Sequence, residues 1–147
     1  MNVPTITLLY SLLQELGTDT TRIGNGSIGL ISAPFTPNSS TTLGILTEAN
    51  YNGYSRKSIG TSSVTFTGGD GKAYVEFSTL QFIPSGSSTP NTIYGAFVTF
   101  GNSTTTLVYT EAFSPALPMA STSNQITITP RFGLDPAGNY GLDVVSN

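Results

Sequence analysis

Apolar residues near the start of the chain follow a helical period. They recur three or four positions apart, at Ile6, Leu9, Leu12, Leu13 and Leu16. This spacing predicts a short amphipathic helix over residues 5–16, because it places the leucines on one face. A helix of this length is marginal alone, so its leucine face must dock on its own domain or on a neighbouring subunit.

After residue 17 the pattern changes from helical to alternating, which is typical of strands. Asn91–Phe100 carries apolar residues on both faces, as a central strand does. Gln125–Pro130 sets two isoleucines against two threonines, as a half-buried strand does. The predicted strands are Ser27–Ala33, Tyr51–Ile59, Ser63–Thr67, Lys72–Phe82, Asn91–Phe100, Thr105–Phe113 and Gln125–Pro130.

Glycine and proline mark the connections between these strands. Gly68-Gly69-Asp70-Gly71 predicts a tight hairpin turn and lacks the spacing of a phosphate-binding loop. Leu43–Leu46 predicts a turn of helix pinned to the body by its apolar side chains. The prolines within Ser114–Pro118 are expected to end a strand.

Many short strands separated by turns predict an all-β fold, an antiparallel β-sandwich or jelly roll. We expect one domain over residues 1–147, with the short helix over residues 5–16 at its N-terminal end. Residues 132–147 are apolar enough, with Tyr140 and Leu142 among them, to form a C-terminal arm that packs or exchanges between subunits.

The composition argues against several classes of function. The 147 residues include no Cys and no His, so a thiolate nucleophile, a Ser-His-Asp relay and the usual zinc sites are absent. The eight acidic residues show no spacing that identifies a catalytic pair or a calcium loop. We therefore expect no enzyme, no cofactor and no metal. A net charge of -3 argues against a basic surface that binds nucleic acid. No apolar run is long enough to span a membrane.

Only 9% of the residues are charged, against about a quarter in typical domains. Ser, Thr, Asn and Gly fill the difference, and such a surface suits close-packed assembly or contact with carbohydrate. Tyr51 and Tyr54 border a loop and are candidates for stacking on a sugar, although tyrosines in strands also pack in cores. Arg56 and Lys57 are a candidate contact for an acidic partner. The alternative interpretation is that they lie on a solvated face of a strand.

Three stretches together resemble a group of small proteins encoded among the structural genes of tailed bacteriophages. They are Leu46–Tyr54, Thr92–Thr99, and Glu111–Phe113 taken with Ile126–Phe132, within residues 43–134. The resemblance implies a virion protein, for which we expect the role of a decoration or cement protein on the capsid surface that binds the major capsid protein. Cyclic assembly, with a trimer favoured, goes with that role. The resemblance implies no catalytic residue.

Two functional hypotheses remain open from the sequence. In the first, the chain decorates and stabilises a capsid, and the candidate interface residues are Leu9, Leu12, Leu13, Leu16, Arg56, Lys57, Tyr140 and Leu142. In the alternative, it is a tail fibre or spike module that binds host-surface carbohydrate through Tyr51 and Tyr54.

Overall fold

The computed structural model describes residues 26–59, 65–69, 72–86, 91–99, 107–134 and 141–146. This part of the chain contains strands, one 3-10 turn and no α-helix, and all the strand pairings are antiparallel. The all-β prediction is confirmed, while the predicted helix over residues 5–16 lies outside the described residues. None of the described helical turns is long and apolar enough to cross a membrane. The elements are β1 (Ser27–Ile31), η1 (Leu43–Ile45), β2 (Lys57–Ser58), β3 (Thr65–Gly69), β4 (Lys72–Glu76), β5 (Leu80–Phe82), β6 (Asn91–Thr99), β7 (Leu107–Met119), β8 (Ile126–Leu134) and β9 (Gly141–Ser146).

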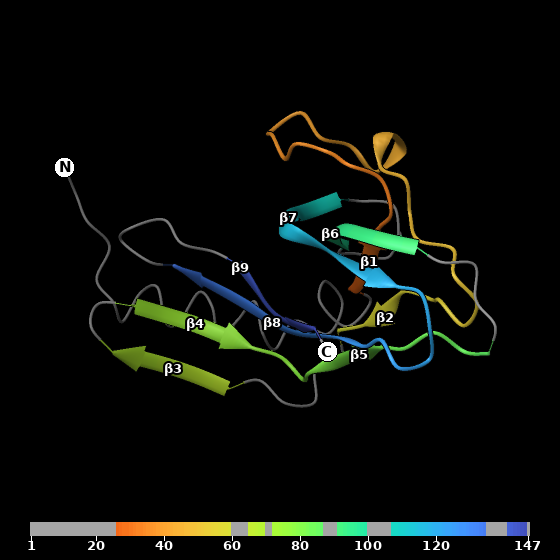
Figure 1. The fold of residues 1–147 in the computed structure, drawn as a ribbon. Coiled ribbons are helices and arrows are strands. Elements are labelled where there is room, and N and C mark those ends of the chain that lie inside the picture. The colour runs from red at the N-terminus through yellow and green to blue at the C-terminus, as the bar shows by residue number, and fades with distance from the viewer. Residues whose placement is uncertain are drawn as a thin grey trace.

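The first sheet has the strand order β2-β1-β6-β7 (Figure 1). Its central pair joins β1 to β6 from Ser27↔Thr99 to Ile31↔Gly95. The prediction of a central strand over Asn91–Phe100 is confirmed, because β6 has a strand on each side. β7 pairs with β6 and ends the sheet on that side.

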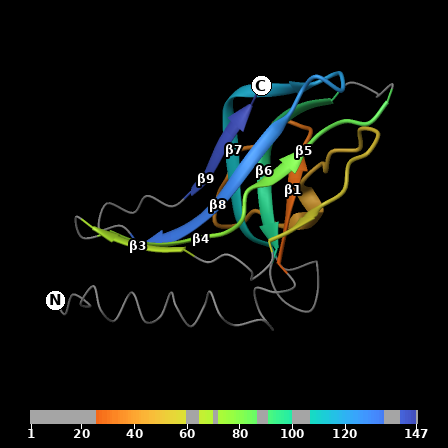
Figure 2. The ribbon, with the colours of Figure 1, turned by 90° about the horizontal axis from the view of Figure 1, so that it is seen from below.

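In the second sheet β8 is the central strand. It pairs with β4 and β5, one after the other, along one side and with β9 along the other. β3 and β4 form a hairpin whose last pair is Gly69↔Lys72, which confirms the predicted hairpin at this glycine-rich turn. Figures 1 and 2 show β3 and β4 to the left of the first sheet, whereas β5 lies close to it.

One hydrophobic core contains apolar side chains from both sheets. The first sheet contributes apolar side chains from β1, β6 and β7, and the second contributes Phe82, Ile126 and Ile128. Thr127 and Thr129 are only half-buried, so the alternation predicted for this strand is confirmed. Burial of these side chains is the main stabilising contribution to the fold, at about 25 cal/mol per Å² of apolar surface.

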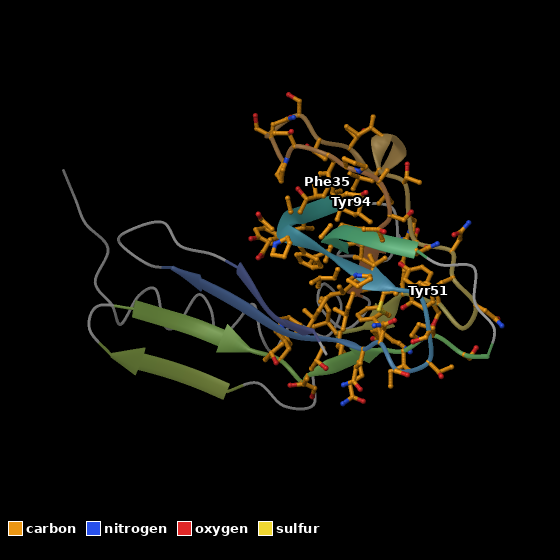
Figure 3. The ribbon with its side chains drawn as sticks, in the orientation of Figure 1. Phe35, Tyr51 and Tyr94 are labelled. Atoms are coloured by element: carbon orange, nitrogen blue, oxygen red, sulfur yellow. The ribbon has the colours of Figure 1, made fainter. Side chains whose placement is uncertain are left out.

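A second apolar layer covers the opposite face of the first sheet. Gly29 pairs with Phe97, and a Cβ at Gly29 would overlap the Phe97 ring. Gly95 leaves room in the same way for the ring of Phe35, which Figure 3 shows at this sheet. Phe97 and Ile31 are fully buried although neither belongs to that core. The first sheet is therefore packed on both faces at its centre.

The segment from Tyr51 to Ile59 differs from the predicted strand. Its chain turns at residues 52–53, where Gly53 has a φ of 85° and Tyr54 N–H donates to Tyr51 C=O at 3.0 Å. Only Lys57–Ser58 pairs as a strand. The left-handed conformation at Gly53 is open to glycine and interrupts the extended chain.

The predicted helical turn near residue 43 exists as the 3-10 turn Leu43–Ile45. Its apolar side chains do not pin it to the body, because none of its residues is buried and Ile45 is 68% exposed. Its own hydrogen bonds, from Ile45 N–H to Thr42 C=O and from Leu46 N–H to Leu43 C=O, close the turn.

β7 continues through the predicted break at Ser114–Pro118 and ends at Met119. The Ser114–Pro115 peptide is cis, and the pairing with β6 shifts between Ile93 and Gly95. Proline is tolerated here because an edge strand does not need every N–H for the ladder.

The C-terminal arm predicted for residues 132–147 is part of the second sheet in its described residues. Residues 132–134 complete β8, and β9 pairs with β8 from Ile126↔Ser146 to Arg131↔Gly141. The apolar pattern of this segment fits a strand that is held by a partner in its own chain.

Candidate functional site

An ion pair between Glu48 and Arg56 lies beside β1. Arg56 Nε donates to Glu48 Oε1 at 2.8 Å, and Arg56 Nη2 donates to Glu48 Oε2 at 2.7 Å. This two-pronged geometry is the strong form of an arginine–carboxylate contact. The guanidinium carbon also lies 4.9 Å from the centre of the Phe97 ring. Arg56 therefore covers the second apolar layer while it neutralises Glu48.

Tyr54 connects this ion pair to the backbone of β1. Its hydroxyl accepts the N–H of Leu30 at 2.9 Å and donates to Glu48 Oε1 at 2.7 Å. Its ring stacks on Phe82 with centroids 6.3 Å apart and meets Tyr51 edge-on at 5.3 Å. The phenol thus spans from the core to the ion pair.

Backbone bonds hold the segment that carries Glu48 against β1. Ala49 N–H donates to Leu30 C=O at 2.9 Å, and Ser32 N–H donates to Thr47 C=O at 2.8 Å. Glu48 itself forms an isolated antiparallel bridge with Ile31. These contacts fix the carboxylate where both Tyr54 and Arg56 reach it.

The protonation states follow from burial and from the pairing. Burial acts to raise the pKa of Glu48, but hydrogen bonds from Arg56 and Tyr54 outweigh it and hold the pKa below 4.5. Burial, and then the bond to Glu48, raise the pKa of Tyr54 well above its usual value. The pair is therefore charged and the phenol neutral near pH 7, an arrangement suited to holding the fold and not to proton transfer.

The structure does not bring the predicted interface residues together in one place. Arg56 is engaged with Glu48, and Lys57 is half-buried in β2 opposite Ile28. Leu142 lies in β9, in register with Pro130. The remaining predicted interface residues lie outside the described residues: Leu9, Leu12, Leu13, Leu16 and Tyr140.

Of the two tyrosines proposed for sugar stacking, Tyr51 is buried and Tyr54 is half-buried. Tyr51 is 3% exposed and belongs to the core, so it offers no ring face to a sugar, contrary to the sequence-based expectation (Figure 3). Tyr54 is half-buried, with its hydroxyl used twice and its ring packed on Phe82. The turn at Gly53 directs both rings inward, and a strand pattern alone gives no signal of it.

A shallow hollow of about 380 Å³ lies between the loop after β1 and the first half of β7. Asn38 shapes this loop, because its Oδ1 accepts the N–H of Ser40 at 2.8 Å and its own N–H donates to Thr41 at 3.1 Å. The hollow has no charged lining residue. It is lined by Pro37, Asn38, Ser39, Thr41, Leu107, Val108, Tyr109 and Thr110.

Among the residues whose side-chain exposure the structure describes, every fully exposed position is uncharged. Four charged side chains have described surroundings, and all four are only half-exposed: Glu48, Arg56, Lys57 and Glu111. The exposed positions are Ser, Thr, Asn, Gln, Gly, Pro and Ala, with three large apolar residues among them. Within the same residues no group of three or more acidic side chains could hold a metal ion.

Comparison with known proteins gives no relative for this chain. No protein-family model, no curated protein and no solved structure matches it.

Proposed function

We propose that this chain is a structural protein of a bacteriophage particle that decorates the capsid surface and stabilises it by binding major capsid subunits. The observation that carries the proposal is that no fully exposed position among the described side chains is charged. Copies of a decoration protein crowd together on a shell, and a surface of hydroxyl and amide groups brings them close without mutual repulsion. Contacts of modest strength then suffice, because the shell repeats them many times.

The positions of the resembling stretches support the same proposal. Leu46–Tyr54 packs beside β1 through Tyr54 and Glu48, Thr92–Thr99 lies in β6, and Glu111–Phe113 lies in the neighbouring β7. The stretch that begins at Ile126 forms most of β8 and contributes to the shared core. Segments distant in sequence thus form one packing unit. On this basis we propose that the two sheets are the layers of an antiparallel β-sandwich common to that group of proteins.

No observation favours the alternative of a carbohydrate-binding tail or spike module. Its argument from the sequence needs exposed rings at Tyr51 and Tyr54, but Tyr51 is buried in the core and Tyr54 is packed against it. No enzymatic role is proposed.

Quantitative mass spectrometry of purified particles tests the decoration role. We expect a copy number equal to that of the major capsid protein or to another simple fraction of the capsid lattice. A handful of copies per particle, or absence from purified heads, would contradict the proposal.

A second experiment tests the stabilising effect. Heads that lack this protein should disassemble at a lower temperature, and added purified protein should bind them to saturation and restore the temperature. The control is an unrelated protein of the same mass and low charge. Equal stability of heads with and without the protein would count against a cementing role.

A further inference from the structure

The hydrogen bonds of Leu30 show which backbone N–H and C=O groups of the first sheet point toward which neighbouring strand. Its N–H donates to Tyr54 and its C=O accepts from Ala49, so both groups point away from β6. Successive residues of an antiparallel strand point alternately to one neighbour and to the other. Ala96, which is opposite Leu30, therefore directs its groups toward β7, where its partner is Glu111.

Thr110 and Ala112 consequently direct their backbone groups out of the sheet. They flank Glu111, and the register is regular from Gly95↔Ala112 to Val98↔Tyr109. β7 is the last strand of its sheet. No group of the described residues bonds to the outward backbone groups of Thr110 and Ala112.

This open edge is short. The register shifts at one end, next to Val98↔Tyr109, and Pro115 lies beyond the other end. Bulges and prolines stop strands from pairing without limit. An added strand is thereby confined to the region of residues 108–112, which favours a contact that closes on itself.

We propose that this edge is a homodimer contact, in which β7 of a second copy pairs antiparallel with β7 about a two-fold axis at Thr110. Thr110 lies opposite Thr110 of the second copy, and their outward N–H and C=O groups bond to each other. Val108, whose side chain is 49% exposed, lies opposite Ala112 of the second copy. The first sheets of both copies then form one continuous sheet.

Charge selects this register. With the axis at Thr110, Tyr109 lies opposite Glu111 of the second copy. A phenol and a carboxylate suit each other, and within one chain Tyr109 already donates to Glu111 Oε2 at 3.0 Å. An axis at Glu111 would instead set two carboxylates opposite each other, with Cα atoms about 4.5 Å apart, which is destabilising. An axis at Ala112 would instead extend the added pairing to Ser114, past the end of the regular register at Gly95↔Ala112.

The contact is independent of the proposed role on a capsid. It uses the same surface on both copies and so closes at two, whereas a trimer needs two different surfaces. A trimer in solution would overturn this proposal and leave the decoration role standing. If the protein is a dimer in solution but is absent from capsids, the decoration role is overturned and the dimer contact stands.

Sedimentation equilibrium of the full chain is the first test. We expect twice the chain mass of 15.4 kDa at micromolar concentration. A mass of one chain, or of three, would overturn the proposal.

Charge swaps at Thr110 test the position of the axis. Thr110→Lys alone and Thr110→Glu alone each place like charges on the axis, and we expect dimers weaker by about tenfold or more. An equimolar mixture of the two should recover the dimer, because Lys then faces Glu. Recovery requires both variants to be folded, so misfolding cannot imitate it.

Thr122→Lys and Thr122→Glu are the matched controls. Thr122 is exposed in the turn after β7, and both changes should leave the dimer unaffected. Failure of the Thr110 mixture to recover, while the Thr122 variants stay dimeric, would overturn the proposal.

Cysteine pairs measure the register directly, because the chain has no Cys of its own. Paired Cα atoms lie about 5.5 Å apart, within disulfide range, so Thr110→Cys should form a linked dimer on mild oxidation. Val108→Cys should not link to itself, because two Val108 positions lie about 13 Å apart along the strands. A mixture of Val108→Cys and Ala112→Cys should link. Linking of Val108→Cys to itself, without the mixed product, would overturn the register.

Discussion

The hydroxyl of Tyr54 takes the place of a missing strand partner for the backbone N–H of Leu30. β2 pairs only with Ser27 and Ile28, and Glu48 bridges to β1 beyond Leu30, at Ile31. Leu30 lies in the gap, where the phenol oxygen meets its N–H at 2.9 Å. One side chain thus completes the edge of β1 and ties it to the ion pair.

Removing this hydroxyl should destabilise the protein. In Tyr54→Phe the ring stays but the N–H of Leu30 loses its acceptor, and we expect the free energy of unfolding to fall by about 1–3 kcal/mol. Urea denaturation measures it. Tyr94→Phe is the control, because the Tyr94 hydroxyl bonds to no described residue. Equal losses in both variants would refute this role of Tyr54.

Gly29 should tolerate no side chain. Gly29→Ala places a Cβ on the ring of Phe97, and such overpacking costs about 1–3 kcal/mol. Gly44→Ala is the matched control, because nothing lies within 4 Å of its added Cβ. Thermal unfolding should show a lower Tm for the first variant and little change for the second. A Tm unchanged by Gly29→Ala would mean that Phe97 does not occupy this position.

Replacing Arg56 by Lys should not preserve its role. Lys cannot make both hydrogen bonds to Glu48 and covers the Phe97 ring less well, and we expect a loss of about 1 kcal/mol because the pair is partly solvated. Lys57→Met is the control at the neighbouring position and should change stability by less than about 0.5 kcal/mol. Urea unfolding of both variants would show whether Arg56→Lys is in fact harmless.

Stability should fall in acid through Glu48. The pKa of Glu48 lies below 4.5 in the folded protein, so its stabilising contribution is present above pH 4.5 and is lost as the pH falls through the folded value. Glu48→Gln should be less stable than the parent at pH 7 and should lose less on acidification. Urea midpoints measured from pH 7 down to pH 3 check this, and parallel curves for the two proteins would exclude Glu48 as the cause.

Stability should also fall in alkali through Tyr51. Burial raises the pKa of Tyr51 from 10 to about 12 in the folded protein. Between these values the unfolded chain releases the proton while the folded chain keeps it, so the free energy of unfolding decreases as the pH rises. Tyr51→Phe should reduce this slope. Urea midpoints from pH 9 to pH 12 measure this slope. An unchanged slope in Tyr51→Phe would mean that another group causes the loss of stability.

The parts of the fold predicted from the sequence are those with a strong local pattern. The alternation in β8, the doubly apolar β6 and the glycines between β3 and β4 each determine a local outcome. The continuity of β7 through Pro115 and the pairing of β9 depend on which strand lies alongside. Local spacing carries no information about such neighbours.

Local spacing likewise could not predict how the residues of the candidate site come together. The sequence draws attention to Arg56 and Tyr54 separately, as a partner contact and as a sugar platform. Their meeting at Glu48 depends on the turn at Gly53 and on the bridge to β1. Because these contacts are set by tertiary structure, spacing along the chain gave no sign that the three residues form one cluster.

The pairing of β1 with β6 determines when the first sheet can form during synthesis. Ser27 and Thr99, whose hydroxyl oxygens lie 2.8 Å apart, are separated by 72 positions along the chain. At about 5–20 residues per second a ribosome takes several seconds to make that stretch. The apolar strand Ser27–Ile31 must stay unpaired with β6 for this time, while the hairpin of β3 and β4 needs only adjacent residues. Newly made chains therefore build their local hairpin first and complete the central pair late, and the apolar β1 is the segment that a chaperone would have to shield.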